Sequence, residues 1–445
     1  MQRRDFVRGA LAAGLAPSLA YSIESALRPA SAQPPSDLPA LDYDEILDEV
    51  LSEIEAVASQ KLETLGGAEF TADFRSVLDQ KKMKADFPTP PLTEDFREEL
   101  RTRKYWNLEE AERPAPVWPT FDRAPDYSHL GVLPLATPSF TLTASVLRVL
   151  AERNSFDLSK TSRPVIIFGL RGCRLADGAD SAPWAEEHRL EVIEPDHISS
   201  RCVLGVWRQA DDLISVYRAS TVPAVAHVYM SLAELGVGSS LLPTGLYAYR
   251  AGTHLANKLK SIQRGALRIS GPYVVLRTAK DLSYDPYADT TAWTRGDAHN
   301  IHAGGSANLF SCAGCQVVPG GYSGTNRLTS TGQWSTFQSA AGLVDADGNA
   351  IVSEEKPSFL YMLLTGHEAA LAFHGGAAFD NGYYRLRPGS SGPEVIRLQE
   401  NLLQQHPGAV EGFSVDGGFG MRTTFAVLID RQKQTGQYTS PVVAI

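Results

Sequence analysis

Histidines and cysteines gather in one short stretch of the chain, and together they are its most reactive combination of side chains. Residues 299–305 read His-Asn-Ile-His-Ala-Gly-Gly, and residues 311–318 read Ser-Cys-Ala-Gly-Cys-Gln-Val-Val. A cysteine becomes a nucleophile when a neighbour takes its proton, and histidine is the side chain that titrates near neutral pH. His302 stands 13 residues before Cys315, a spacing that suits two adjacent strands joined by a Gly-rich turn. The sequence therefore predicts a Cys315 nucleophile with His302 as its base.

Gly314 stands directly beside the predicted nucleophile. A residue without a side chain lets a substrate backbone come close, and successive backbone amides at the same place can hold an oxyanion. We therefore expect Cys315, His302 and Gly314 to be the catalytic residues, and this chemistry requires no cofactor.

The same residues also fit a metal site, which is the alternative interpretation. His299 and His302 form an H-x-x-H pair, and Cys312 and Cys315 form a C-x-x-C pair. Two nitrogens and two sulfurs at such spacings are typical zinc ligands. A structural zinc ion accounts for both pairs, but it leaves the glycine-rich approach to Cys315 unexplained.

Other chemistries lack the residues that they need. His367-Glu368 has Leu371 where a zinc-protease helix needs its second histidine, and neither a G-x-S-x-G nor a phosphate-binding glycine loop occurs. His254 and His374 are interpreted as ordinary surface or core histidines without a role.

The motifs around His302 and Cys315 resemble the L,D-transpeptidase (YkuD-like) catalytic domain. In that family a histidine-glycine motif precedes a serine-x-glycine-cysteine motif that carries the nucleophile, and His302, Gly314 and Cys315 match it. Ala303 and Cys312 stand where the family has glycine and serine, so the resemblance is to a diverged member. It implies an attack by Cys315 on a peptidoglycan stem peptide. An amine then resolves the thioester in a transpeptidase, and water resolves it in a carboxypeptidase.

Short strands must position this site. β-branched and aromatic residues dominate five runs that are bounded by turn signals. These runs are residues 164–168, 202–207, 213–217, 245–249 and 273–276. Apolar residues at helical spacing over 221–235 predict one helix on the sheet. The expected fold class is α+β, with a strand-rich catalytic domain over 126–380, an N-terminal helical extension and a small C-terminal three-helix domain.

The C-terminal residues 386–437 read as a glycine-bearing turn, an amphipathic helix, a tight Asp-Gly turn and a further helix. They resemble the three-helix peptidoglycan-binding domain. The matching residues are Gly389, Gly392, Val395, Leu398, Gln399, Asp416, Gly417, Phe419 and Gly420. The resemblance implies that Leu398, Gln399, Asp416 and Phe419 bind the ligand and that peptidoglycan is the partner. Arg431 departs from the pattern of the family's last helix.

The N-terminus has the order of an export signal. Arg3 and Arg4, with Phe6 after them, precede a mildly apolar run and the small-residue site 30–32. This order resembles the twin-arginine signal, so residues 1–32 are expected to be removed on export. Residues 33–125 are interpreted as a tether and helical extension. The expected location is periplasmic or extracellular, at the cell wall.

The overall composition narrows the function further. Lysine and arginine number 41 against 51 acidic residues, for a net charge of -10, which disfavours nucleic acid as a partner. After the first 30 residues no apolar run approaches the ~18 residues of a membrane helix, so no integral membrane segment is expected after signal cleavage. Cys173 and Cys202 could pair after export, with buried free thiols as the alternative.

Overall fold

The computed structural model describes residues 137–445, except for short gaps. The gaps are 196, 198, 225–226, 228–238, 257–261, 278–291, 297, 306–309, 311, 325, 376–383 and 437–439. The predicted signal peptide, the extension over 33–125 and most of the helix predicted over 221–235 lie outside the described residues. The described part is mixed α+β and strand-rich, which confirms the predicted fold class.

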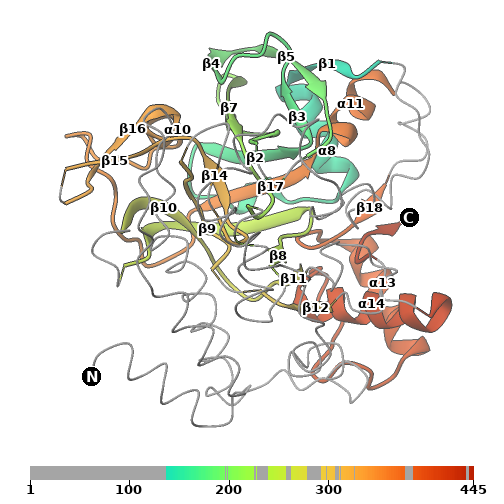
Figure 1. The fold of residues 1–445 in the computed structure, drawn as a ribbon. Helices are drawn as coiled ribbons and strands as arrows, with labels where there is room; N and C mark the ends of the chain where they lie inside the picture. Colours follow the sequence, from blue (N-terminus) through green and yellow to red (C-terminus); the bar gives the residue numbers. More distant parts are fainter. Residues whose placement is uncertain are drawn as a thin grey trace, which may run out of the picture.

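A nine-stranded sheet forms the centre of the molecule, in the order β14-β13-β10-β9-β17-β2-β6-β7-β4 (Figure 1). Its strands are β2 (Val165–Arg171), β4 (Ser181–Ala185), β6 (Cys202–Arg208), β7 (Leu213–Ala219), β9 (Gly245–His254), β10 (Gln263–Ile269), β13 (Ile301–Ala303), β14 (Gln316–Val318) and β17 (Phe359–Thr365). Four of the five predicted runs are β2, β6, β7 and β9. The fifth is β11 (Val274–Arg277), in a separate sheet with β8 (Ser240–Leu241) and β12 (Ala292–Arg295).

The large sheet curls until β14, the strand at one end, meets the chain just after β7, the strand next to β4 at the other end. Ser220, the residue after β7, and Val317 in β14 exchange two backbone hydrogen bonds of 2.9 Å each. This closure satisfies backbone groups that would otherwise be left open at the edge of β14. The contact between Ser220 and Val317 is the join of the barrel-like sheet, and the predicted site lies there, next to β14.

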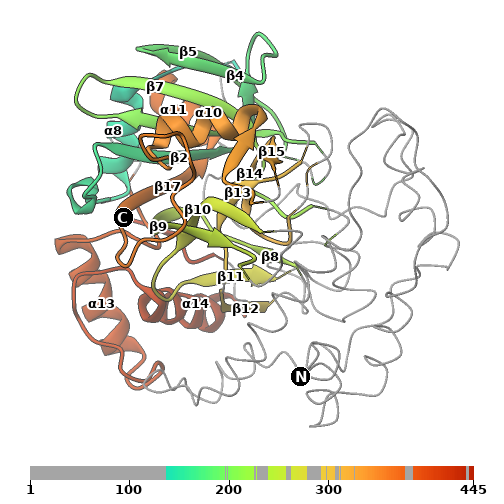
Figure 2. The ribbon, with the colours of Figure 1, turned by 90° about the vertical axis from the view of Figure 1, so that its left-hand side faces the viewer.

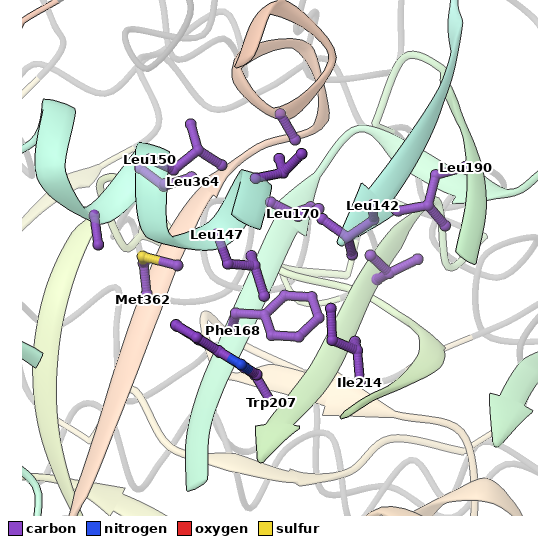
Figure 3. Close-up of a cluster of buried hydrophobic side chains, with 14 of the residues drawn as sticks. Leu142, Leu147, Leu150, Phe168, Leu170, Leu190, Trp207, Ile214, Met362 and Leu364 are labelled. Atoms are coloured by element: carbon purple, nitrogen blue, oxygen red, sulfur yellow. The ribbon is translucent and has the colours of Figure 1, made fainter. Parts of the chain in front are cut away.

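Two apolar cores pack on the two faces of the sheet, as the two-residue period of a strand requires. Along β2, Ile166, Phe168 and Leu170 face one core, whereas Val165 and Ile167 face the other. The first core is covered by α8 (Ala144–Arg153), α11 (Gly366–His374) and a small sheet of β1 (Ser139–Thr143), β5 (Glu187–Val192) and β3 (Cys173–Leu175). Figure 3 shows Leu147 of α8 beside Phe168, and Leu150 of the same helix beside Leu364.

The second core is covered by α10 (Gly332–Ala341). Trp334 and Phe337 of this helix have no exposed surface, and their rings stack with centroids 5.4 Å apart. The short hairpin of β15 (Gly321–Ser323) and β16 (Thr329–Thr331) leads into α10.

The C-terminal unit contains α13 (Pro393–Gln405) and α14 (Met421–Thr435), with β18 (Arg385–Leu386) paired to β19 (Val443–Ala444). Within the described part of residues 384–445 there are thus two α helices, whereas the sequence predicts three. Figure 2 shows α14 beside β11 and β12, with α13 on the far side of α14. One buried apolar cluster contains residues from both the C-terminal unit and the part of the molecule that precedes it. It includes Val222, Leu241, Val274, Trp293, Phe310 and Cys315, together with Leu386, Val395, Phe419, Phe425 and Leu428.

Polar contacts also fasten this unit to the sheet. Arg387 and Glu368 of α11 form an ion pair of 2.5 Å, and both side chains are completely buried. Gly389 has a φ of 93°, and a Cβ there would lie 2.3 Å from the carbonyl oxygen of Leu246, so only glycine permits this close approach. The C-terminal unit is therefore packed firmly against the rest of the molecule, and is not only joined to the sheet by the chain. No helix among the described residues is long and apolar enough to cross a membrane.

Candidate active site at the join of the sheet

Strand pairing brings His302 and Cys315 together. His302 lies in β13, which pairs in parallel with β14, and Cys315 is the residue directly before β14. The two residues therefore flank adjacent strands, as their spacing predicts. The pairing is parallel, so the chain between them crosses back along the sheet instead of making the simple turn that we expected.

His254, at the end of β9, completes the group. One ring nitrogen of His254, one of His302 and the Sγ atom of Cys315 all lie within 4.8 Å of one another, and all three residues are buried. The two imidazole rings stack with centroids 4.4 Å apart and planes 12° apart. The sequence interpretation gave His254 no role, and its place beside Cys315 corrects that interpretation. His254 belongs to no motif and comes from a different part of the chain.

A tight turn wraps the thiol of Cys315. Its Sγ atom donates to the carbonyl oxygen of Ala298 at 3.2 Å and accepts from the backbone N–H of Asn300 at 3.4 Å. Ala298 has a φ of 57°, the left-handed region that residues with a Cβ rarely adopt. Backbone strain of this kind clusters at functional sites. The turn therefore places both a hydrogen-bond acceptor and a donor on the sulfur.

His302 has a defined proton position. Its Nδ1 lies 2.7 Å from the carbonyl oxygen of Ala303. A carbonyl can only accept, so Nδ1 carries the hydrogen and Nε2 of the neutral ring carries a lone pair. His302 has no exposed surface, whereas Cys315 keeps 7%. The ring is thus set up to accept a proton from the thiol beside it.

His254 has the opposite proton position. The Oδ1 atom of Asn300 accepts from the backbone N–H of Ile269 at 3.3 Å, which fixes the orientation of the Asn300 amide. Its Nδ2 therefore donates to Nδ1 of His254 at 2.9 Å. Because that nitrogen accepts, the hydrogen of the neutral His254 ring is on Nε2.

A metal ion fits this arrangement poorly. Among the described residues, the group close enough to hold one is His254, His302 and Cys315. It shares two members with the predicted zinc set but lacks His299 and Cys312, which is a correction to that set. Zinc binds a histidine nitrogen through its lone pair and usually finds an acceptor on the other nitrogen. On His254 the second nitrogen faces an amide donor, so zinc binding at Nε2 would require that hydrogen bond to break.

His299 packs against Gly314 instead of joining the group of His254, His302 and Cys315. A Cβ on Gly314 would lie 2.8 Å from Nε2 of His299 and 2.8 Å from the carbonyl oxygen of Ser240. The space beside Gly314 is therefore filled by protein, and not by an approaching substrate as the sequence suggested. Cys312 is fully buried and donates to the carbonyl oxygen of Val222 at 3.3 Å.

Buried tyrosines support the loops on both sides of the thiol. Tyr249 donates to the carbonyl oxygen of His299 at 2.7 Å, and Tyr273 Oη lies 3.0 Å from Nδ1 of the same histidine. Burial, and then the neighbouring tyrosines and Cys315, raises the pKa of Tyr249 well above its ordinary value. Tyr249 therefore remains a neutral hydrogen-bond donor and holds the residue that packs on Gly314. The sequence analysis identified neither tyrosine.

The other three cysteines are more deeply buried than Cys315. All four cysteines are free thiols, so the possible Cys173–Cys202 bond is not formed in this structure. Burial, and then the nearby Cys202, raises the pKa of Cys173 well above its ordinary value. Thiols that stay protonated react slowly, because the thiolate is the nucleophile.

The residues predicted to bind peptidoglycan have mixed positions. Gln399 is 1% exposed, and its amide bridges the backbone N–H groups of Asp416 and Gly417 and the hydroxyl of Thr423. Phe419 is 2% exposed and belongs to the shared core. These two residues therefore build the unit instead of contacting a ligand. Asp416 is exposed and Leu398 is half-buried, so their predicted contact with a ligand stays a prediction.

Comparison of the chain with protein-family models, with curated proteins and with solved structures gives no match. The inference of function therefore depends on the geometry of the site and on the resemblance of its motifs.

Proposed function

We propose that this protein is a cysteine-dependent acyl-transfer enzyme that acts on peptidoglycan stem peptides, as an L,D-transpeptidase or an L,D-carboxypeptidase. The observation that carries this proposal is the closeness of the Cys315 sulfur to a ring nitrogen of His302, within 4.8 Å, at the join of the sheet. His302 has a lone pair on Nε2 because its Nδ1 donates to a carbonyl. A thiol beside such a ring is an activated nucleophile.

The chemistry divides into two steps. The S–H bond of Cys315 first rotates away from the carbonyl of Ala298, and its proton passes to Nε2 of His302. The thiolate, which still accepts from the N–H of Asn300, attacks the peptide carbonyl. The C–N bond breaks, the leaving amine takes the proton from His302, and a thioester remains. An incoming amine or water then gives its proton to His302 and releases the acyl group from sulfur.

The proposed substrate class depends on two resemblances in separate parts of the chain. The His302 and Cys315 motifs resemble those of L,D-transpeptidases, and residues 386–437 resemble a peptidoglycan-binding domain. The shared core places that unit against the same cluster that contains Cys315. A module that held the cell wall there would keep stem peptides near the sulfur. The proposed location, outside the cytoplasm after twin-arginine export, is the compartment where this substrate is found.

A second candidate function is a non-enzymatic peptidoglycan-binding protein with a structural zinc ion. The closeness of His254, His302 and Cys315 is the observation in its favour. Metal analysis of the purified full chain separates the two functions. About one zinc ion per chain, whose removal by a chelator unfolds the protein, would favour this candidate over the enzyme.

Selective alkylation tests the enzymatic proposal. We expect iodoacetamide to modify Cys315 first, because its neighbours can take its proton and the other three thiols are at most 1% exposed. Cys315→Ala should abolish both this labelling and the release of D-alanine from tetrapeptide stems, as measured by mass spectrometry. Cys312→Ser is the matched control, because a serine hydroxyl can still donate to Val222.

Labelling at a cysteine other than Cys315 would contradict the assignment of the nucleophile. Stem-peptide turnover that persists in Cys315→Ala would contradict the proposed chemistry itself. Loss of activity in Cys312→Ser, with the fold intact, would also count against it, because that side chain is directed at a backbone carbonyl.

A further inference from the structure

Gln263, the first residue of β10, has a buried side-chain amide whose oxygen accepts no hydrogen bond. The residue is 4% exposed. Its Oε1 atom is buried and has no hydrogen-bond partner among the residues that the structure describes. Buried amides in folded proteins are almost always satisfied, because an acceptor that is removed from water without a donor destabilises the fold. This amide therefore needs an explanation other than packing.

A second buried glutamine shows what packing alone requires. Gln338 of α10 has no exposed surface. Its Nε2 donates to the carbonyl oxygens of Arg264 and Gly265 at 3.0 and 3.1 Å, and its Oε1 accepts from the hydroxyl of Ser330. The two side chains are of the same type and equally enclosed. Gln338 is satisfied within the protein, whereas the oxygen of Gln263 is not.

The pairing of β9 with β10 places the unsatisfied amide beside the candidate site. Gln263 is the cross-strand partner of His254. Directly opposed residues of an antiparallel pair have side chains on the same face, with Cβ atoms about 4.5–5.5 Å apart. On that face the His254 ring stacks on His302, and one of its nitrogens lies within 4.8 Å of Sγ of Cys315. The amide of Gln263 is therefore next to the group that surrounds the sulfur.

We propose that Oε1 of Gln263 accepts a hydrogen bond from a backbone N–H of the peptide substrate while the scissile carbonyl lies at Cys315. An extended peptide advances about 3.3 Å per residue, so an N–H two or three residues from that carbonyl spans the distance from the sulfur to the partner of His254. Gln263 is thus a specificity-determining residue. This inference rests on the proposed function and deepens it, because it names a group that recognises the peptide backbone of the substrate.

The chemistry of an unsatisfied acceptor explains why such a residue selects peptides. A peptide N–H supplies the donor that Oε1 lacks. An ester oxygen at the same position would place two acceptors against each other and leave the amide unsatisfied. The site should therefore distinguish a peptide from an ester of the same shape.

Stability gives a test that needs no ligand. Gln263→Met keeps the length of the side chain and removes the unsatisfied amide, so the urea midpoint of the full chain should stay the same or rise. Gln338→Met is the matched control, and its midpoint should fall because it breaks hydrogen bonds that are made. A midpoint for Gln263→Met that falls as far as that of Gln338→Met would overturn the proposal, since the amide would then have partners within the protein.

Recognition is measured by the rate at which acetyl-trialanine chloromethyl ketone labels Cys315, as the sulfur displaces chloride. Three analogues each carry an ester oxygen in place of one N–H of the peptide. With the wild-type chain, we expect one analogue to react about tenfold more slowly than the parent ketone, which corresponds to the loss of one hydrogen bond. In Gln263→Met this difference should shrink to within about twofold.

The remaining outcomes separate this inference from the proposed function. Equal rates for all four ketones with the wild-type chain, or the same tenfold difference in Gln263→Met, would overturn the role of Gln263 alone. A wild-type chain that prefers the peptide ketone but releases no D-alanine from stem peptides would overturn the proposed function alone. If no ketone labels Cys315, the assignment of the nucleophile fails, and this inference fails with it.

Discussion

The buried ion pair between the C-terminal unit and α11 offers the sharpest stability test, through the variant Glu368→Gln. Oε1 of Glu368 lies 2.5 Å from Arg387, and both side chains have no exposed surface. Oε2 accepts from the N–H and hydroxyl of Thr365, which closes the capping box of α11. Glutamine keeps the size, and its single amide oxygen can keep the capping box, which turns its NH2 group toward Arg387. The substitution therefore removes the charge and replaces the hydrogen bond to Arg387 by a contact between two donors.

The expected cost follows from what remains. Arg387 stays protonated at any accessible pH, so the variant retains a buried cation without the carboxylate of Glu368. Breaking a buried pair in this way costs about 3–5 kcal/mol of the free energy of unfolding. Arg387 keeps its 2.8 Å hydrogen bond to Thr244, which places the expected value near the lower end. Arg387→Met should cost less at pH 5 than at pH 8, because the remaining carboxyl can take up a proton and become neutral.

Urea unfolding followed by tryptophan fluorescence measures these costs. The double variant Glu368→Met, Arg387→Met should recover most of the loss, since apolar replacement of both partners is often neutral or stabilising. Asp211→Asn, which breaks an exposed pair with Arg208, is the control and should leave the midpoint nearly unchanged. A cost below about 1 kcal/mol for Glu368→Gln, or a double variant as unstable as that single one, would refute the reasoning.

Three further predictions address pH, packing and export. Burial, and also the nearby Arg171, lowers the pKa of His197 from 6.5 to about 3 despite its bond to the carbonyl of Pro223. As the pH falls, the unfolded chain therefore takes up this proton before the folded chain does. His197 should then lower the free energy of unfolding by about 1.4 kcal/mol per pH unit from pH 6 toward pH 4. His197→Asn should reduce that slope in urea titrations, and an unchanged slope would exclude His197 as its source. Gly205→Ala should cost about 1–3 kcal/mol in thermal unfolding, because the new Cβ would lie 2.1 Å from Phe168; a cost near zero would mean that the ring can move aside. Replacing Arg3 and Arg4 by lysine keeps the charge but removes the planar guanidinium groups, so twin-arginine export should stop. Normal amounts of the variant in the periplasmic fraction would contradict the prediction of a twin-arginine signal.

The sequence by itself determined the local elements. The strands β2, β6, β7, β9 and β11 were predictable, because β-branched and aromatic runs between turn signals depend on neighbours in the chain. The approach of His302 to Cys315 was expected because 13 residues are enough for two adjacent strands, whereas the parallel pairing of β13 and β14 was not. In the C-terminal unit, the two helices follow from their apolar spacing.

Only the tertiary structure decided which groups surround the sulfur. His254 reaches Cys315 because β9 and β10 lie between β17 and β13 in the sheet, and strand order is a property of the whole fold. Gly314 meets His299, and Gln399 and Phe419 turn inward, because side chains from distant segments fill the available space. The C-terminal unit shares a core with the sheet for a similar reason: apolar faces that are separate in sequence are buried together when water is excluded from both.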